Sequence, residues 1–229
     1  GHAIAPAIYK SLPFDPDKDF AAITQLVSTA TTLVALPSLP VKNFQEFVAL
    51  AKSRPGALNY GSTGVGNSLH LIMELLMRDT GMVMTQVPFR GDAPLIQAFM
   101  SGDIQAAVLP SSAAKPQMES GVVRALGVSS AKRLNAMPDV PTLAEQGLPD
   151  FAVSGWMGLF APAATPRPII ERLAQEARTA MASPEVAPKL AGFGMEPAVF
   201  GPEAMDALYR SDRTKFQRIV KEANIALQD

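Results

Sequence analysis

The chain has 229 residues, of which 48% are hydrophobic and 18% charged, and its formal net charge is −1. This length allows one large domain or two modest ones with a substantial core. The balanced charge argues against a nucleic-acid surface, which needs a basic stripe. The lack of any cysteine excludes disulfides and thiolate metal sites, and no run of about 18 apolar residues is present to span a membrane.

The N-terminal segment combines turn signals with one β-rich stretch and one capped helix. Residues 1–20 are rich in turns, and a short helix is expected around 5–9. Residues 22–35 contain many β-branched side chains and predict one or two strands. The sequence Asn-Phe-Gln-Glu at 43–46 is a capping box in its Asn form, and the helix that it opens ends at Pro55-Gly56.

A regular alternation of strands and helices follows. Strands are predicted at 57–60, 84–88, 104–109 and 122–128, with helices between them at about 68–79, 93–101 and 111–119. Strands separated by single helices predict a parallel sheet with right-handed crossovers. The nearly continuous apolar run at 123–128 is typical of a strand covered on both faces.

The last third of the chain is mostly helical. A turn at 138–142 is expected to lead into a short helix ending at Gly147, and a strand is expected at 151–161. Cap residues followed by proline predict further helices at about 166–182, 184–192 and 202–226. We therefore expect one compact α/β domain at 30–152. The flanking parts, 1–29 and 153–229, are expected to form a second domain whose sheet is incomplete.

Two strand–turn–helix junctions are the most informative feature of the chain. In each, glycine occupies the turn and a short polar residue precedes the helix, so free backbone N–H groups and the positive end of a helix dipole point at one spot. Side by side, two such junctions would form a socket for a small anion. The candidate binding residues are Ser62, Thr63, Gly64, Asn67 and Ser68 from the first junction, and Phe89, Arg90, Gly91, Asp92 and Ala93 from the second.

The glycine-rich turn matches no nucleotide-binding fingerprint. Gly66 is followed by Asn67, whereas a phosphate-binding P-loop needs Lys at that place. The dinucleotide pattern also fails, because its third glycine is missing. The alternative to anion binding is a tight turn whose polar residues only cap the helix.

The sequence leaves two possible roles for each of the two charged side chains of the second junction. Asp92 is expected to be the N-cap of its helix. Its carboxylate would repel a plain anion, although it would suit a ligand that also carries an ammonium group. Arg90 could hold a carboxylate through a bidentate fork, or it could be a solvated rim charge.

Little in the sequence indicates catalysis. The histidines are His2 and His70, no spacing suits a zinc site, and no serine lies in a G-x-S-x-G elbow. His70, in the first turn of its helix, is better explained by hydrogen bonding or packing than by base catalysis. Trp156 either walls a cleft between domains or packs in a core. We expect no catalytic residue, no metal and no cofactor.

Seven short strings in a fixed order carry a resemblance to a known family. They are GHAIAP at 1–6, LPFDPDKDF at 12–20, LNYGS at 58–62, VPFRG at 87–91, SSAKR at 129–133, MPDVPT at 137–142 and WMGLFAP at 156–162. Each is weak alone, but together they span essentially the whole chain. The chain resembles the substrate-binding receptors of tripartite tricarboxylate transporters, also called Bug receptors.

The resemblance implies a two-lobed periplasmic-binding-protein-like fold of type II, an α/β fold with a parallel-rich sheet flanked by helices. It implies a location in the periplasm and a small carboxylate ligand, such as a dicarboxylate, a tricarboxylate or an acidic amino acid. The implied partners are the membrane subunits of the transporter, with no catalysis, no nucleic acid and no insertion of the receptor into the membrane. Backbone N–H groups of two opposed loops would bind the ligand, and they map onto the junction residues named above.

Family members carry a strand and a glycine-rich loop before the segment that matches Gly1-His2. The resemblance therefore implies a first lobe that is incomplete here and a binding site that binds carboxylates weakly or not at all. Two other functions stay open. One is a small-molecule α/β enzyme that uses Ser62 and His70, and the other is a sensory ligand-binding domain.

Overall fold

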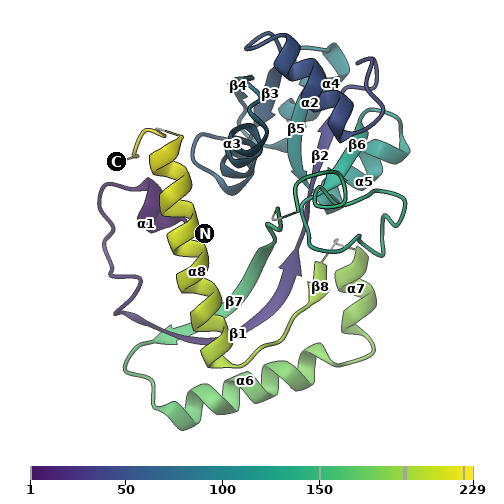
Figure 1. Cartoon of the computed structure of the whole chain (residues 1–229). Helices are drawn as coiled ribbons and strands as arrows, with labels where there is room; N and C mark the ends of the chain where they lie inside the picture. The colour runs from purple at the N-terminus through teal and green to yellow at the C-terminus, as the bar shows by residue number, and fades with distance from the viewer. Residues whose placement is uncertain (1, 150, 193–194, 224, 229) are drawn as a thin grey trace. The chain divides into compact units, whose positions relative to one another are not determined.

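The structure is a computed structural model that describes residues 2–149, 151–192, 195–223 and 225–228. The chain folds into two compact units (Figure 1). The terminal unit consists of Gly1–Thr29 and Gly155–Asp229, and the central unit consists of Ala30–Ser154. The chain thus leaves the terminal unit after Thr29 and returns to it at Gly155.

The central unit contains a five-stranded sheet in the order β4-β3-β5-β2-β6. The strands are β2 (Thr31–Ala35), β3 (Asn59–Ser62), β4 (Thr85–Pro88), β5 (Ala106–Pro110) and β6 (Arg124–Val128). β3 pairs in parallel with β4 and β5, whereas β2 runs antiparallel to β5 and β6. The four strands predicted to be parallel, β3, β4, β5 and β6, therefore all run in the same direction, with antiparallel β2 inserted between β5 and β6. β2 differs because no helical crossover precedes it.

The described residues of the central unit form four helices. They are α2 (Phe44–Ser53), α3 (Ser68–Thr80), α4 (Asp92–Ser101) and α5 (Ser111–Glu119). Half of the predicted capping box of α2 is present. The Asn43 side chain accepts the N–H of Glu46 at 2.9 Å, whereas the Glu46 carboxylate accepts the N–H of Lys42 at 2.7 Å rather than that of Asn43. Fully buried side chains from β2, β5 and α4, among them Val34, Leu109 and Phe99, form one apolar cluster. Val87 and Phe89, at the end of β4, pack against this cluster.

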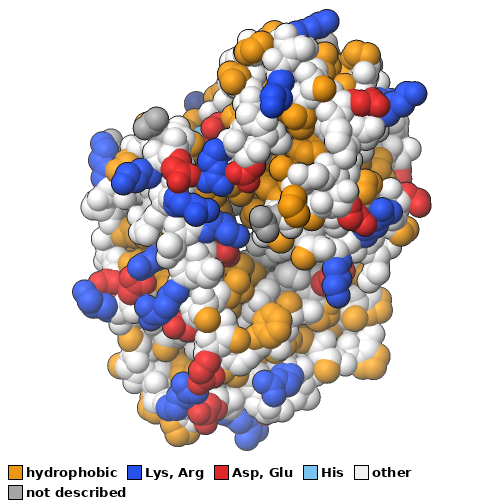
Figure 2. All heavy atoms as spheres, viewed as in Figure 1, with side chains coloured by type: hydrophobic (Ala, Val, Ile, Leu, Met, Phe, Trp, Pro, Cys, Tyr) orange, Lys and Arg blue, Asp and Glu red, His pale blue; other side chains and the backbone are white. Residues whose placement is uncertain are grey.

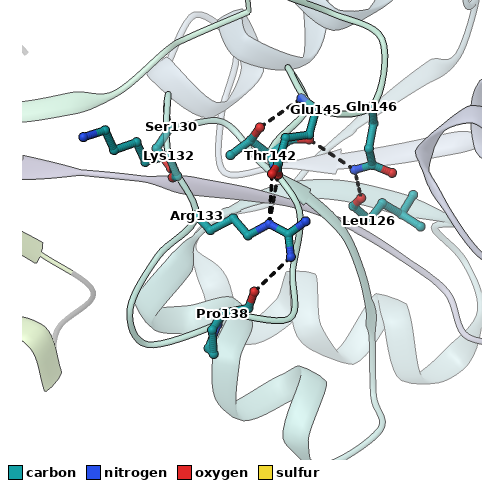
Figure 3. A network of polar contacts seen from close by, with 8 residues as sticks. All are labelled: Leu126, Ser130, Lys132, Arg133, Pro138, Thr142, Glu145 and Gln146. Carbon is teal, nitrogen blue, oxygen red and sulfur yellow. Dashed lines mark hydrogen bonds and ion pairs between the residues drawn. The ribbon is translucent and has the colours of Figure 1, made fainter.

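The predicted short helix ending at Gly147 is wrong, because the segment forms turns (Figure 3). Thr142 Oγ1 accepts the N–H of Glu145 at 3.0 Å, as in a capping box. The carbonyl oxygen of Gln146, however, accepts a hydrogen bond from the Gln45 side chain at 2.8 Å. The Gln146 amide also donates to the Leu126 carbonyl at 2.7 Å. The local backbone bonds are those of turns, from Gln146 N–H to the Leu143 carbonyl and from Gly147 N–H to the Ala144 carbonyl.

The terminal unit contains a three-stranded antiparallel sheet in the order β7-β1-β8. Its elements are α1 (Ala5–Ile8), β1 (Phe20–Thr29), β7 (Gly155–Pro162), α6 (Arg167–Met181), α7 (Val186–Gly192), β8 (Met195–Pro197) and α8 (Pro202–Glu222). Ala161 of β7 packs with Ile170 of α6, whereas Trp156 of β7 bonds to Asp212 of α8. Because strand side chains alternate, α6 and α8 cover opposite faces of the sheet.

Several boundaries differ from those predicted. The β-rich stretch 22–35 is two strands that belong to different sheets, β1 and β2. β8 was not predicted, and α8 ends at Glu222 rather than near 226. The strand predicted at 151–161 begins only at Gly155.

The surface carries both signs of charge. Figure 2 shows Lys and Arg side chains interspersed with Asp and Glu over the visible face. Many of the basic groups are paired within one helix, for example Arg172 with Glu176 at 2.6 Å. Of the helices in the described ranges, none combines the length and apolar character needed to cross a membrane.

Candidate functional site

The two predicted junctions lie next to each other in the central unit. β3 and β4 are parallel neighbours in a register that places Ser62 beside Pro88. The N–H of Phe89, one residue further on, donates to the Ser62 carbonyl at 2.7 Å. Both chains therefore leave the sheet at the same edge, the carboxyl ends of parallel strands, where open α/β sheets commonly bind ligands.

The first junction is tightly braced by its own side chains. Ser62 is only 2% exposed, and its hydroxyl accepts from the Gln86 amide at 2.7 Å. Asn67 is the N-cap of α3, since its Oδ1 accepts the N–H of His70 at 2.9 Å. Its Nδ2 donates to Thr63 Oγ1, also at 2.9 Å. Ser62, Thr63 and Asn67 thus hold the shape of the turn with the same polar groups that could meet a ligand.

The helix start beyond this turn remains accessible. Ser68 is the first residue of α3 and is exposed. The first N–H groups of an α-helix have no acceptor within the helix, and they carry the positive end of its dipole. The geometry at Ser68 is therefore suited to a negatively charged oxygen atom.

The second junction is built differently from the prediction. Asp92 was predicted to cap α4, but it is the first helical residue, and the N-cap is Gly91 with φ +106° and ψ 177°. This backbone conformation is essentially restricted to glycine, so the cap position falls on Gly91. No side chain caps α4. Arg90, Gly91, Asp92 and Ala93 are all exposed, which leaves the start of α4 open to solvent.

Phe89 differs from its exposed neighbours. Its half-buried side chain packs against the apolar cluster of the central unit. Its backbone N–H is bonded to Ser62. Both of these contacts brace the second junction against the sheet.

A buried polar network lies beneath the first junction. His70 Nδ1 accepts the N–H of Gly66 at 3.0 Å, and its Nε2 lies 3.4 Å from Glu74 Oε1. The Tyr60 hydroxyl donates to the same carboxylate oxygen at 2.6 Å. Burial alone would raise the pKa of Glu74, but the hydrogen bonds from His70 and Tyr60 outweigh it and lower that pKa. Burial, and secondarily the Glu74 carboxylate, raises the pKa of Tyr60.

Sequence reasoning found one member of this network and missed two. His70 was singled out as a hydrogen-bonding or packing residue, which agrees with its position. Glu74 lies four residues later on the same helix, a spacing that brings side chains together. That spacing was the available signal. Tyr60 reaches Glu74 only through the packing of β3 against α3.

The arrangement does not resemble a catalytic pair. Both ring nitrogens of His70 are engaged by Gly66 and Glu74, and the Ser62 hydroxyl bonds to Gln86 and to the Gly64 carbonyl. Within the described ranges no cluster of three or more His, Cys, Asp or Glu side chains could hold a metal ion.

The other two residues singled out from the sequence lie in the terminal unit. The indole N–H of Trp156 donates to Asp212 Oδ2 at 2.7 Å. The His2 ring packs among aromatic rings, with its centroid 4.7 Å from that of Phe160 and 5.2 Å from that of Tyr209.

Several solved structures share this fold. Rpa4515 of R. palustris with adipate is 29% identical and has a TM-score of 0.85, covering 100% of this chain and 77% of that one. The periplasmic binding protein BugD is 26% identical with a TM-score of 0.82, covering 99% and 77%. MatC (Rpa3494) from Rhodopseudomonas palustris with bound malate is 31% identical with a TM-score of 0.77, covering 96% and 76%. The predicted periplasmic-binding-protein-like α/β fold is confirmed.

This chain spans less than two thirds of the length of three curated relatives. A "UPF0065 protein in tcbD-tcbE intergenic region" from Pseudomonas sp. (strain P51) is 32% identical over 215 residues, which cover 93% of this chain and 64% of that protein. The matched part spans between 61% and 65% of three such relatives. A family model described as "Tripartite tricarboxylate transporter family receptor", TctC, matches residues 1–225. The predicted resemblance is confirmed, and the chain belongs to the TctC family of receptors.

Proposed function

We propose that this chain is the solute-binding part of a periplasmic receptor that captures a small carboxylate for a tripartite tricarboxylate transporter. The observation that carries this proposal is the pair of adjacent strand–helix junctions at one edge of the central sheet. Each presents a helix start to solvent, at Ser68 and at Asp92. Adipate and malate in two structures of similar fold support the ligand class.

The ligand would be held mainly by backbone N–H groups. A carboxylate oxygen at the start of α3 would accept from the first helical N–H groups, beginning at Ser68. The exposed Arg90 guanidinium could form a bidentate pair with a carboxylate at the second junction. Asp92 stands beside it and would favour a ligand that also carries an ammonium group. In this proposal the predicted lobe 30–152 supplies these contacts, and the membrane subunits of the transporter receive the ligand.

Titration of the 15N-labelled 229-residue chain with adipate, followed through its backbone amide resonances, tests this proposal. We expect progressive shifts confined to residues 62–68 and 89–93, with malate acting on the same residues. The sequence left open weak binding or none; we propose weak binding, with a Kd near or above about 1 mM, or about −4 kcal/mol. 1,6-Hexanediol at equal concentration, which matches the carbon chain of adipate but carries no charge, is the control and should shift neither junction. Adipate shifts that are absent, or that lie only elsewhere, would contradict the proposal.

A further inference from the structure

His70 lies behind the first junction, where a ligand would not touch it. It is 4% exposed, although it belongs to the first turn of a helix whose start is open to solvent. Its backbone N–H donates to the Asn67 side chain, and its ring accepts from the Gly66 backbone. One residue therefore binds the last two residues before α3 from two directions.

The bonds of this histidine define which ring nitrogen carries the proton. The Gly66 N–H is a donor, so His70 Nδ1 must be the unprotonated acceptor at 3.0 Å. The proton of a neutral ring is then on Nε2, which faces Glu74 Oε1 at 3.4 Å. Tyr60 donates to the same oxygen at 2.6 Å and holds the carboxylate in place. These contacts connect Tyr60, Glu74, His70 and Gly66 in series, and they link strand β3 to the turn.

The turn depends on this support because its backbone is unusual. Gly64 and Gly66 have φ values of +130° and +80°. Glycine has more conformational freedom than any other residue, so a turn that contains two such positions needs external bonds to keep one shape. The Gly66 N–H would lose its acceptor if His70 Nδ1 were absent or protonated.

We propose that His70 is a positioning residue of the carboxylate site: its neutral imidazole holds the Gly64–Gly66 turn in the shape that aims the N–H groups at the start of α3. The part of this proposal that concerns affinity rests on the proposed carboxylate-binding function. The part that concerns the turn does not, since it can be measured without any ligand. His70 acts through Gly66 and does not itself contact the ligand.

Two substitutions of similar size separate positioning from simple filling of space. In His70→Asn the side-chain oxygen can occupy the place of Nδ1 and accept the Gly66 N–H. In His70→Gln the oxygen lies one bond further out, nearer the place of Nε2. Leu76→Ala is the control, because Leu76 is fully buried on the same helix and its truncation destabilises the unit without touching the turn.

Amide hydrogen exchange of Gly66 is the first measurement. We expect exchange to accelerate about tenfold in His70→Gln, the effect of losing one hydrogen bond, and to stay near the wild-type rate in His70→Asn. Leu76→Ala should leave the ratio of Gly66 exchange to that of the α3 amides unchanged. Unchanged Gly66 exchange in His70→Gln, or equal acceleration in both His70 variants, would overturn the positioning role.

Adipate titration of the same variants is the second measurement. We expect the affinity read from the Ser68 amide shift to fall in His70→Gln and to recover in His70→Asn. If wild-type protein shows no adipate shifts, the proposed function fails, while the exchange measurement still decides whether His70 holds the turn. If wild-type protein binds and both variants bind equally well, the link from His70 to affinity is wrong.

Discussion

At Gly91 the backbone has φ +106° and ψ 177°, and the space where a Cβ would lie contains no atom within 4 Å. A side chain there would therefore suffer strain without a clash. We predict that Gly91→Ala lowers the free energy of unfolding by about 1–3 kcal/mol, as measured by urea denaturation. Gly121→Ala is the matched control, since Gly121 has φ +76° and equally open surroundings. Gly121→Ala should lower the free energy of unfolding by less than Gly91→Ala does, and a larger loss at Gly121 would contradict the prediction.

Glu74 makes the stability of the chain depend on pH. Its pKa in the folded state lies below the ordinary value of 4.5, because the His70 and Tyr60 hydrogen bonds outweigh burial. A carboxyl whose pKa is lowered by folding stabilises the fold above its unfolded pKa, and loses that effect as the pH falls through its folded pKa. We predict that wild-type protein loses stability relative to Glu74→Gln as the pH falls below about 4.5.

Urea denaturation of both proteins between neutral pH and about pH 3 measures this difference. Tyr60→Phe is the companion variant. It removes one of the two bonds to Glu74, so its pH dependence should lie between those of the other two proteins. Parallel profiles for wild-type protein and Glu74→Gln would show that Glu74 is not the group responsible.

The sequence allowed the two junctions to be located, because glycine and capping residues are local signals. The turn at 61–68 and the helix after it follow from Gly64, Gly66 and Asn67 alone. The network below the turn could not be predicted in the same way. Tyr60 meets Glu74 only when β3 packs against α3, and nothing in either segment specifies that contact.

Substitutions at the N-caps of α3 and α2 test whether a negative charge at the start of α3 affects carboxylate binding. Asn67 and Asn43 are both N-caps, of α3 and α2, and each accepts a backbone N–H at 2.9 Å. Aspartate caps a helix as well as asparagine does. The carboxylate cannot replace the amide donation, which goes to Thr63 Oγ1 at residue 67 and to Glu46 Oε1 at residue 43. We predict that Asn67→Asp and Asn43→Asp each lower the free energy of unfolding by a similar amount, about 0.5–1.5 kcal/mol, as measured in urea.

The same pair should differ in carboxylate binding. A new negative charge at residue 67 lies at the proposed anion site, so we expect Asn67→Asp to weaken adipate binding about tenfold, or about 1.4 kcal/mol. Asn43→Asp should leave the adipate affinity unchanged, as read from amide shifts. Equal affinities for the two variants would place the anion away from the start of α3.

The type of an element could be predicted where hydrophobic periodicity and capping residues indicate the same structure. It was harder to predict where contacts with distant segments determine the structure. The helices α2, α3, α4 and α5 follow from local signals. The stretch 22–35 carries one continuous β pattern, yet it divides at Ala30 between two sheets because its partners differ. β8 is too short, at three residues, to leave a recognisable pattern.

At the scale of the whole molecule, the central unit has its own sheet and core, and both of its ends meet at one residue. The N–H of Thr31 donates to Ser129 Oγ at 3.1 Å, and the N–H of Val153 donates to the Ser129 carbonyl at 2.9 Å. Close ends are typical of units that can fold alone. We predict that residues 30–154 form a folded protein with a cooperative thermal transition by circular dichroism.

A shorter fragment, residues 36–154, is the control for this prediction. It lacks β2, which lies between β5 and β6 in the sheet. Without β2 the sheet divides, so we expect this fragment to show no cooperative transition. If residues 30–154 also lack a transition, the central unit depends on the rest of the chain.

The pairing of β1 has a consequence for the order of folding during synthesis. Among the described residues, the strands that pair with β1 are β7 and β8, and the last residue of β1, Thr29, lies opposite Gly155 and Met195. The ribosome must therefore translate the whole central unit before β7 and β8 are available to pair with β1. The central sheet can form while β1 is still unpaired. Pairing between strands that are distant in the sequence is slow, and it leaves unpaired strand edges exposed to aggregation. β1 therefore has an unpaired edge, open to aggregation, for as long as the central unit is being synthesised.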